Sequence, residues 1–278
     1  MGYRFCAHMT TNDDTGSQLR SLYEPEGGAS AVFSAKVADY SASRPDYPAP
    51  LFETLSVACE LSADAVIADI GAGTGLLTQG LLQKGYQVIA VEPNAAMRKA
   101  CDRLLGKFSG YRSIEGSAES IPLEASSVDL ITAAQAFHWF EIEKARTECL
   151  RVLRPKGKVA LIWNDRVFED PLHVELDAIF AEFGGAKRAA LVAHAKSTDV
   201  LRFFGLTVPM EFSWPHEHLL VEEGLASLVF SRSYMPERNS AAGRDVRLRV
   251  HEVFSRFTKA GVLAVRYRTV ARVGRPVM

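Results

Sequence analysis

The chain has 278 residues and a formal net charge of −1, with 47% hydrophobic and 23% charged residues. This length and composition are typical of a soluble globular enzyme and argue against a disordered chain. No apolar stretch approaches the roughly 20 residues that cross a bilayer, and the polar N-terminus lacks the apolar core of a secretion signal, so we expect a cytoplasmic protein without a membrane partner.

Charge is distributed unevenly along the chain. Residues 232–275 contain 11 Lys and Arg residues against 3 Asp and Glu residues, a local charge of +8. A solvated basic face is one interpretation of this excess, and a surface that attracts an anionic substrate is the other. Aromatic residues do not alternate with these arginines as they do in grooves for single-stranded nucleic acid, so we expect no nucleic-acid partner.

A polar arm and two helices are predicted before the first strand. Residues 1–30 are rich in small polar residues and predict a flexible N-terminal arm, within which Met9 is an alternative start to Met1. Helices are predicted over 31–40 and 50–59, and the sequence Arg44-Pro45-Asp46-Tyr47-Pro48 ends the first of them.

Strand and helix patterns alternate from residue 65 onward. This alternation implies right-handed crossovers and a doubly wound parallel sheet. Apolar runs predict strands at 65–70, 87–91, 111–115, 128–134 and 157–163, and helices are expected between them at 74–84, 94–106 and 142–153.

The pattern changes after residue 166, which ends a core expected over 31–166. The C-terminal part, 167–278, contains a predicted helix at 171–183, strands at 206–214 and 263–270, and a mainly helical stretch at 221–258 that breaks at Met235-Pro236. The two late strands complete a seven-stranded, mainly parallel α/β sheet of the Rossmann-like type. The helical stretch is expected as an insertion over the carboxyl edge of this sheet, where ligands bind.

A glycine-rich turn follows the first predicted strand. Asp69 ends the apolar run, and Gly71, Gly73 and Gly75 remove side chains where a ligand must touch the backbone. The next predicted strand leads to Glu92, at the position where an acid accepts hydrogen bonds from ribose hydroxyls. These two features together predict a nucleoside site.

The spacing of the glycines favours one nucleoside ligand. Dinucleotide enzymes use G-x-G-x-x-G, whereas this turn reads G-x-G-x-G and has Leu76 at the position of the other pattern's third glycine. Asp69 would repel a pyrophosphate but suits an ammonium group. S-adenosylmethionine carries an ammonium and a sulfonium and is therefore the expected cofactor. A nicotinamide-dependent oxidoreductase is the alternative.

Six motifs follow one another along the chain. They are Tyr40-Ser-Ala-Ser-Arg-Pro-Asp-Tyr47, Asp69-Ile-Gly-Ala-Gly-Thr-Gly75, Val91-Glu92-Pro93, Gly116-Ser-Ala-Glu119, Gln135-Ala-Phe-His-Trp-Phe140 and Leu150-Arg-Val-Leu-Arg-Pro-Lys-Gly157. This succession resembles the class I S-adenosylmethionine-dependent methyltransferases, specifically the type 11 family. The resemblance implies that the cofactor is bound by Tyr40, Arg44, Asp69, Gly71, Ala72, Gly73, Gly75, Glu92, Pro93, Met97, Ser117, Ala118, Glu119, Gln135, Ala136 and Phe137.

The segment after the fourth strand and the helical insertion are expected to contact the acceptor. His138 is the candidate general base, or the group that orients the acceptor, because an imidazole accepts a proton near neutral pH. A histidine satisfied by nearby backbone is the alternative. The acceptor pocket is expected to be shaped by Trp139, Arg232, Tyr234 and Arg238, and arginines suit a carboxylate or another anion.

These observations predict methyl transfer to a small-molecule acceptor by a monomer or homodimer. A catalytically silent cofactor-binding protein is the remaining alternative. No metal is expected, because His216 and His218 would share one face of a strand without a third ligand at a suitable spacing. The cysteines are isolated in sequence and predict buried free thiols: Cys6, Cys59, Cys101 and Cys149.

Overall fold

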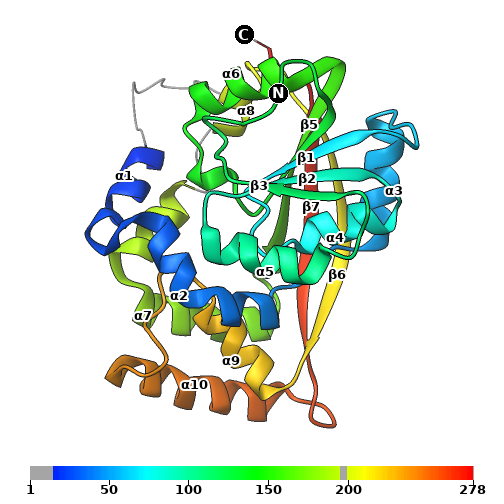
Figure 1. The fold of residues 1–278 in the computed structure, drawn as a ribbon. Coiled ribbons are helices and arrows are strands. Elements are labelled where there is room, and N and C mark those ends of the chain that lie inside the picture. The colour runs from blue at the N-terminus through cyan, green and yellow to red at the C-terminus, as the bar shows by residue number, and fades with distance from the viewer. Residues whose placement is uncertain (1–14, 195–198, 278) are drawn as a thin grey trace, which may run out of the picture.

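The computed structural model describes residues 15–194 and 199–277, and it shows a single sheet surrounded by helices (Figure 1). The first 14 residues of the predicted arm lie outside the described residues, and so do Cys6 and Met9.

Seven strands form the sheet. They are β1 (Val66–Ile70), β2 (Gln87–Val91), β3 (Tyr111–Ile114), β4 (Val128–Ala134), β5 (Leu153–Arg166), β6 (Met210–Leu220) and β7 (Leu263–Gly274). Their order across the sheet is β3-β2-β1-β4-β5-β7-β6. Pairing is parallel from β3 to β5, and β7 runs antiparallel to both of its neighbours, β5 and β6. The predicted seven-stranded, mainly parallel sheet is confirmed.

Helices cover both faces of this sheet. On one face, α3 (Ala49–Ala58), α4 (Leu76–Gln83) and α5 (Ala95–Leu105) form a core with Ile67 of β1. On the other face, α6 (Ile142–Val152) and α8 (Asp199–Phe203) form a second core with Ala68 of β1. Adjacent residues of β1 belong to opposite cores, so the strand is buried on both faces, which explains the apolar run that precedes Asp69. The doubly wound arrangement is therefore confirmed.

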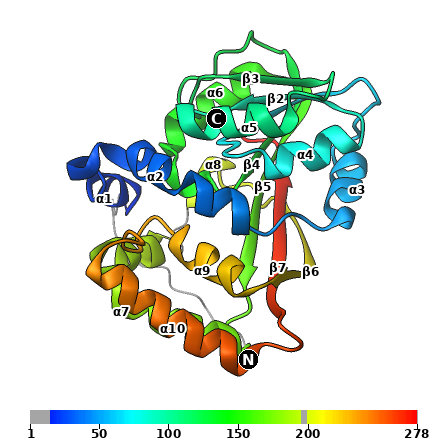
Figure 2. The same ribbon diagram turned by 60° about the horizontal axis from the view of Figure 1, so that its bottom comes forward.

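A third core lies among the C-terminal helices. α7 (Pro171–His194), α9 (Glu222–Phe230) and α10 (Ala241–Phe257) pack together through buried side chains such as Phe180, Phe230 and Val250 (Figure 2). α9 and α10 lie within the helical stretch predicted at 221–258, and residues 231–240 form the break between them.

Residues 15–30 differ from the predicted flexible arm. They form α1 (Thr15–Ser21), the 3₁₀ helix η1 (Glu24–Glu26) and the start of α2 (Gly28–Ser43), which is longer than the helix predicted at 31–40. Leu19 and Tyr23 are fully buried, and the Tyr23 hydroxyl hydrogen bonds with the Ser233 hydroxyl at 2.8 Å. Two apolar side chains four residues apart are enough to anchor the segment, and the polar composition around them conceals this in the sequence.

Some C-terminal boundaries also differ from the predictions. α7 continues to His194 across a non-helical kink at Gly185 (φ 53°, ψ −148°) instead of ending at 183. β6 covers Met210–Leu220 instead of 206–214, because Leu206 has a left-handed φ of 64° in the turn after α8. Exposed and partly buried side chains alternate along β6, but His216 and His218 occupy two of the partly buried positions and weaken the period-2 signal.

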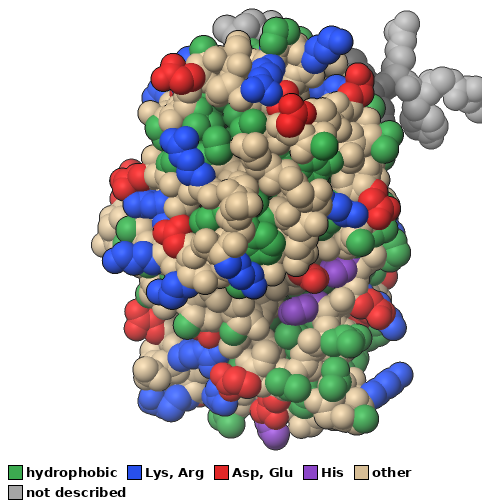
Figure 3. Space-filling model, turned by 45° about the vertical axis from the view of Figure 1, so that its right-hand side comes forward, with side chains coloured by type: hydrophobic (Ala, Val, Ile, Leu, Met, Phe, Trp, Pro, Cys, Tyr) green, Lys and Arg blue, Asp and Glu red, His purple; other side chains and the backbone are tan. Residues whose placement is uncertain are grey.

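Acids from elsewhere in the fold neutralise much of the basic stretch at 232–275. Basic and acidic side chains are intermixed on the face shown in Figure 3. The described residues include no helix that is long and apolar enough to cross a membrane. Arginines of the stretch that form ion pairs with carboxylates are Arg238, Arg247, Arg249, Arg256, Arg266 and Arg272.

Candidate functional site

The glycine-rich turn connects β1 to α4. Gly71, Gly73 and Gly75 have φ values of 68°, 58° and 91°, in the left-handed region that residues with side chains rarely adopt. A Cβ atom at Gly71 would lie 2.6 Å from the Cβ of Ala136, so that position has no room for one. A Cβ atom at Gly73 would have the Tyr40 ring as its nearest neighbour, 3.9 Å away. Glycine at position 73 therefore leaves open space above the backbone.

Glu92 follows β2 and is joined to this turn. Its Oε2 accepts a hydrogen bond from the Gly73 N–H and its Oε1 accepts one from the Asn94 N–H, both at 2.9 Å. Burial raises the pKa of Glu92, and the two backbone hydrogen bonds oppose this rise. A carboxylate offers about four lone-pair sites, so about two remain for hydroxyl groups of a ligand.

A cavity of about 190 Å³ opens beside Glu92 and the turn, and we call it the glycine-turn cavity. Most of the predicted cofactor residues line it: Tyr40, Gly71, Gly73, Glu92, Pro93, Met97, Ser117, Ala118, Glu119, Gln135 and Ala136. Lining residues outside the predicted site are Phe33, Ile70, Asn94, Ala134 and Phe140. Asn94 is the N-cap of α5, and an Asn that begins a helix just after a strand is a signal that could have found it.

Asp69, which is expected from the sequence to attract an ammonium group, does not line the glycine-turn cavity. Its side chain is 1% exposed, and its two oxygens accept hydrogen bonds from the hydroxyls of Thr78 (2.6 Å) and Thr132 (2.8 Å). Burial raises the pKa of Asp69 to about 6. The carboxyl group thus joins β1 to α4 and β4 inside the core. Ala72 and Gly75 also lie outside the lining of the cavity.

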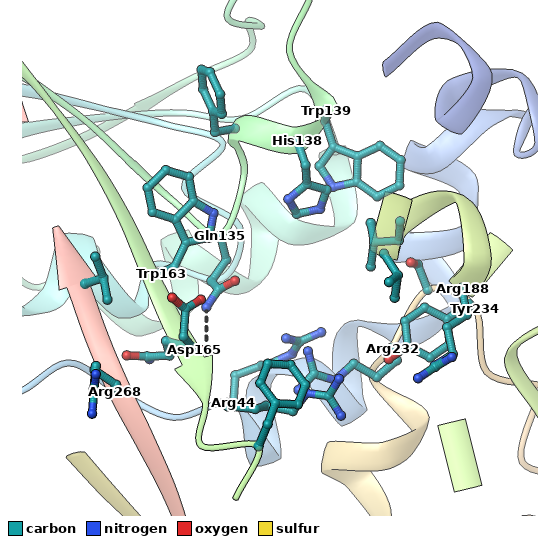
Figure 4. A pocket seen from close by; sticks show the side chains of 18 of the residues that line it. Arg44, Gln135, His138, Trp139, Trp163, Asp165, Arg188, Arg232, Tyr234 and Arg268 are labelled. Atoms are coloured by element: carbon teal, nitrogen blue, oxygen red, sulfur yellow. Dashed lines mark hydrogen bonds between the residues drawn. The ribbon is translucent and has the colours of Figure 1, made fainter. Parts of the chain in front are cut away.

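A second cavity of about 750 Å³ adjoins the first, and we call it the arginine cavity. Phe33, Tyr40, Gln135 and Trp139 line both cavities. Gln135 has a left-handed φ of 56°, uncommon for a residue with a side chain, and its N–H is fixed to the Ile162 carbonyl at 2.9 Å. Other predicted residues that line the arginine cavity are Arg44, Phe137, His138, Arg232 and Tyr234 (Figure 4).

Four arginines line the arginine cavity close to one another: Arg44, Arg166, Arg188 and Arg232. Asp177 pairs with Arg166 at 2.9 Å and with Arg188 at 2.8 Å. Burial and the nearby charge of Arg232 lower the pKa of both Arg44 and Arg166. The sequence does not single out Arg166 or Arg188, because neither belongs to a motif. The arrangement concentrates positive charge at this part of the cavity.

Arg238 does not line either cavity, contrary to its predicted role in the acceptor pocket. Its guanidinium pairs with Asp39 at 2.5 Å and with Glu223 at 2.8 Å, and it lies over the Phe230 ring with 4.8 Å to the ring centroid. The prediction was wrong because Arg238 is near Arg232 in the sequence but not in its surroundings. The irregular segment between them separates the two side chains. Arg238 instead fastens α2 to the C-terminal helices.

His138 lies in η2 (Phe137–Trp139) at the wall of the arginine cavity. Its ring contacts that of Trp139, with 5.0 Å between the centroids. Figure 4 shows His138 and Trp139 across the cavity from Arg44 and Arg232. The arrangement places an imidazole within the space that a second ligand would occupy.

His216 and His218 hold the connection between α2 and α3. His216 Nε2 lies 2.9 Å from Asp46 Oδ1, and His218 Nε2 lies 3.1 Å from the Ser43 carbonyl oxygen. Within the described ranges, no group of three or more His, Cys, Asp or Glu residues could hold a metal ion. Three of the predicted buried thiols are confirmed, and burial raises their pKa: Cys59 to about 11, Cys101 to about 12 and Cys149 to about 12.

The fold is that of Rossmann-like methyltransferases of known structure. A protein from Anaeromyxobacter dehalogenans, assigned provisionally to the type II methyltransferases, matches with a TM-score of 0.56 and 24% identity over 84% of this chain and 99% of that one. A provisionally assigned methyltransferase from an antibiotic biosynthesis pathway of Anabaena variabilis matches with a TM-score of 0.56 and 19% identity over 83% of this chain and 98% of that one. At these identities the likeness concerns the fold.

Sequence similarity shows the family. A model of the family described as a methyltransferase domain matches residues 68–161. An uncharacterized methyltransferase-like protein of Schizosaccharomyces pombe is 33% identical over 205 residues, which are 73% of this chain and 78% of the relative. An uncharacterized methyltransferase of Mycobacterium tuberculosis is 35% identical over 205 residues, 74% of this chain and 78% of the relative. The chain belongs to the type 11 methyltransferase family.

The match to relatives is not uniform in length. An uncharacterized methyltransferase of Schizosaccharomyces pombe is 42% identical over 136 residues, but this match spans 49% of the chain and 53% of the relative.

Proposed function

We propose that the protein transfers the methyl group of S-adenosylmethionine to a small anionic acceptor. One observation carries this proposal, namely that two cavities of different chemistry meet along a wall formed by Phe33, Tyr40, Gln135 and Trp139. One cavity presents glycine backbone and a carboxylate, and the other presents arginines. A donor and an acceptor bound in these cavities would have their reacting atoms at the shared wall.

The residues of the glycine-turn cavity suit S-adenosylmethionine. The remaining lone pairs of Glu92 would accept hydrogen bonds from the two ribose hydroxyls. Met97 and Ala118 offer an apolar surface for the adenine ring, and the open backbone at Gly73 admits the methionine part. Arg44, whose guanidinium lies 4.6 Å from the centre of the Tyr40 ring, would be available to the methionine carboxylate.

S-adenosylmethionine supplies an electrophilic methyl group on its sulfonium when it is bound. The task of the chain is then to align the acceptor and to exclude water. The α1–α2 segment contributes to exclusion, because Tyr23 and Phe33 pack edge-on against Trp139 with centroid distances of 5.2 and 5.7 Å. The arginines fix one end of the acceptor and so leave its other end at the shared wall.

His138 would accept a proton from the acceptor or orient it. The assignment is supported by its place on the cavity wall beside Trp139, which also lines the glycine-turn cavity. A base is needed only when the reacting atom of the acceptor stays protonated at the working pH. For such an acceptor, His138→Gln should lower kcat and remove the pKa of the acidic limb from the pH profile, because a general base acts only when it is deprotonated. An unchanged profile would end this assignment.

Titration calorimetry tests the donor. We expect S-adenosylmethionine and S-adenosylhomocysteine to bind at one site per chain, while NAD produces no heat above dilution. Binding of NAD without binding of S-adenosylmethionine would overturn the proposed donor and would favour a nicotinamide-dependent oxidoreductase.

A further inference from the structure

We propose that the acceptor carries at least two negative charges and that its anionic end is held by Arg166 and Arg232, with the hydroxyl of Tyr267 beside them. This inference rests on the proposed function, because it names the class of molecule that the arginine cavity receives. It goes beyond the proposed function by stating the charge of the acceptor and the residues that bind its anionic end.

The balance of charge in the arginine cavity is the first argument. Arg44, Arg166, Arg188 and Arg232 supply four positive charges, and Asp177 is the carboxylate that pairs with members of this group in the described part of the chain. A donor carboxylate on Arg44 would still leave a net charge of +2. The remaining charged lining residues cancel in number: Asp165 and Glu169 against Arg268 and Arg272.

The surroundings of Arg232 are the second argument. Among the described residues its side chain forms no hydrogen bond or ion pair, and its Nε is buried without a partner. Its guanidinium lies 5.6 Å from the centre of the Phe180 ring, and that of Arg166 lies 5.2 Å from the same ring. Two guanidinium groups share one aromatic ring, and each has a buried nitrogen without a partner. Arg166 is paired with Asp177, so Arg232 is the less compensated of the two, and a partly buried cation without a partner is costly unless an anion joins it.

Tyr267 is the third argument. Its side chain is 3% exposed, and its hydroxyl has no hydrogen-bond partner within residues 15–194 and 199–277. Tyr267 is not among the residues that line the arginine cavity, but it is the register partner of Arg166 across β5 and β7. Burial raises the pKa of its hydroxyl, and the charges of Arg232, Arg44 and Arg166 oppose the rise. Buried hydroxyls are normally hydrogen-bonded in folded proteins. A buried donor hydroxyl on the register partner of Arg166 is suited to an anionic oxygen.

These observations favour a dianion over a monoanion. A single carboxylate would neutralise one of the two excess charges and would leave the other buried. Two carboxylates, or one phosphate, would neutralise both, and two negative charges are the chemistry that these sources share. Aromatic side chains of Trp139, Trp163 and Phe168 line the same cavity and would contact the uncharged part of the acceptor.

A series of probes that differ in charge tests the inference. Benzoate, benzene-1,3-dicarboxylate and inorganic pyrophosphate are titrated into the full chain with saturating S-adenosylhomocysteine, at one fixed ionic strength. We expect both multivalent probes to bind at least tenfold more tightly than benzoate. Equal affinity for benzoate and the dicarboxylate would overturn the inference, and preference for pyrophosphate over the dicarboxylate would identify a phosphate as the anionic source.

Variants locate the site. Arg232→Gln and Arg166→Gln should each weaken binding of the dicarboxylate at least tenfold and leave the affinity for S-adenosylhomocysteine within twofold. Tyr267→Phe, which retains the shape of the side chain, should weaken binding of the dicarboxylate about threefold. Arg247→Gln is the matched control, because Arg247 is an exposed arginine paired with Glu223 at 2.8 Å, and it should change neither affinity.

The outcomes separate this inference from the proposed function. Dicarboxylate binding that depends on Arg232 in a chain that does not bind S-adenosylhomocysteine would refute the donor and retain the anion site. Methyl transfer to neutral acceptors that is unchanged in Arg232→Gln would refute the inference and retain the methyltransferase. If Arg232→Gln does not fold, Arg166→Gln and Tyr267→Phe decide the question.

Discussion

The backbone N–H of Gly73 donates a hydrogen bond to Oε2 of Glu92 at 2.9 Å, although the two residues follow different strands of the sheet. The turn after β1 and the acid after β2 are therefore one unit. The second oxygen of Glu92 accepts from the Asn94 N–H, which fixes the carboxylate at the start of α5. A ligand that contacts either the turn or the carboxylate meets a site that is already organised.

Replacing Glu92 should lower the affinity for S-adenosylmethionine. Glu92→Ala removes the charged acceptor of two ribose hydroxyls, and hydrogen bonds to charged groups contribute about 1.5–3 kcal/mol each, so we expect affinity for S-adenosylmethionine to fall at least about 100-fold. Titration calorimetry measures this change. The exposed Glu115, paired with Arg98 at 2.6 Å, gives the control Glu115→Gln, which should leave affinity unchanged. Unchanged affinity in Glu92→Ala would show that the ribose lies elsewhere.

The role of the glycine-rich turn can be tested by comparing two glycines that both have left-handed φ values, one in the turn and one outside it. Gly73 and Gly85 have φ values of 58° and 92°, so an alanine at either position is strained and should cost about 1 kcal/mol of stability or more. A Cβ at Gly73 would project beside the ligand, whereas a Cβ at Gly85 would meet nothing within 4 Å. We therefore expect both variants to lower the melting temperature, and only Gly73→Ala to lower affinity for S-adenosylhomocysteine more than tenfold. Equal affinity in the two variants would remove position 73 from the site.

Asp69 should affect the pH dependence of stability. Its pKa is raised from 3.8 to about 6, so the folded state holds a proton that the unfolded state releases between these values. Ionising this buried group therefore costs stability as pH rises from about 4 to 6, by about 3 kcal/mol in total. Urea unfolding at pH 4.5 and pH 7.5 measures this change. The stability of wild type relative to Asp69→Asn should fall between the two pH values, and parallel pH curves would contradict the assignment.

Arg238 should contribute to stability and not to acceptor binding. Arg238→Gln breaks its pairs with Asp39 and Glu223, and because these groups are partly exposed the loss should be about 1 kcal/mol in the free energy of unfolding. The KM for the acceptor should stay within twofold of the wild-type value. A raised KM with unchanged stability would restore the predicted role of Arg238 in the acceptor pocket.

The sequence predicts the glycine-turn cavity well because its signals are local. Gly71 and Gly73 follow a buried strand directly, and Glu92 follows the next strand, so parallel pairing alone brings them together. The direction of the Asp69 side chain cannot be predicted from the motif. The same motif is consistent with a carboxylate that faces a ligand and with one that accepts hydrogen bonds from Thr78 and Thr132.

The arginine cavity depends on contacts between distant segments. Arg166 ends β5, Arg188 follows the kink of α7 at Gly185, and Arg232 begins the irregular segment after α9. No periodicity relates these positions, and Phe180 and Asp177 bring them together only in the folded chain. Arg238 shows the converse, because proximity in sequence does not place it in the cavity.

Transfer of a labelled methyl group tests the central claim most directly. Wild type is incubated with S-adenosylmethionine labelled in its methyl group and with fractions of small metabolites separated by anion exchange, and Glu92→Ala serves as the control. We predict that label enters a product from the strongly retained, multivalent fractions and that Glu92→Ala loses this incorporation. A chain that binds S-adenosylmethionine but labels no fraction would contradict the account and would indicate a catalytically silent binding protein.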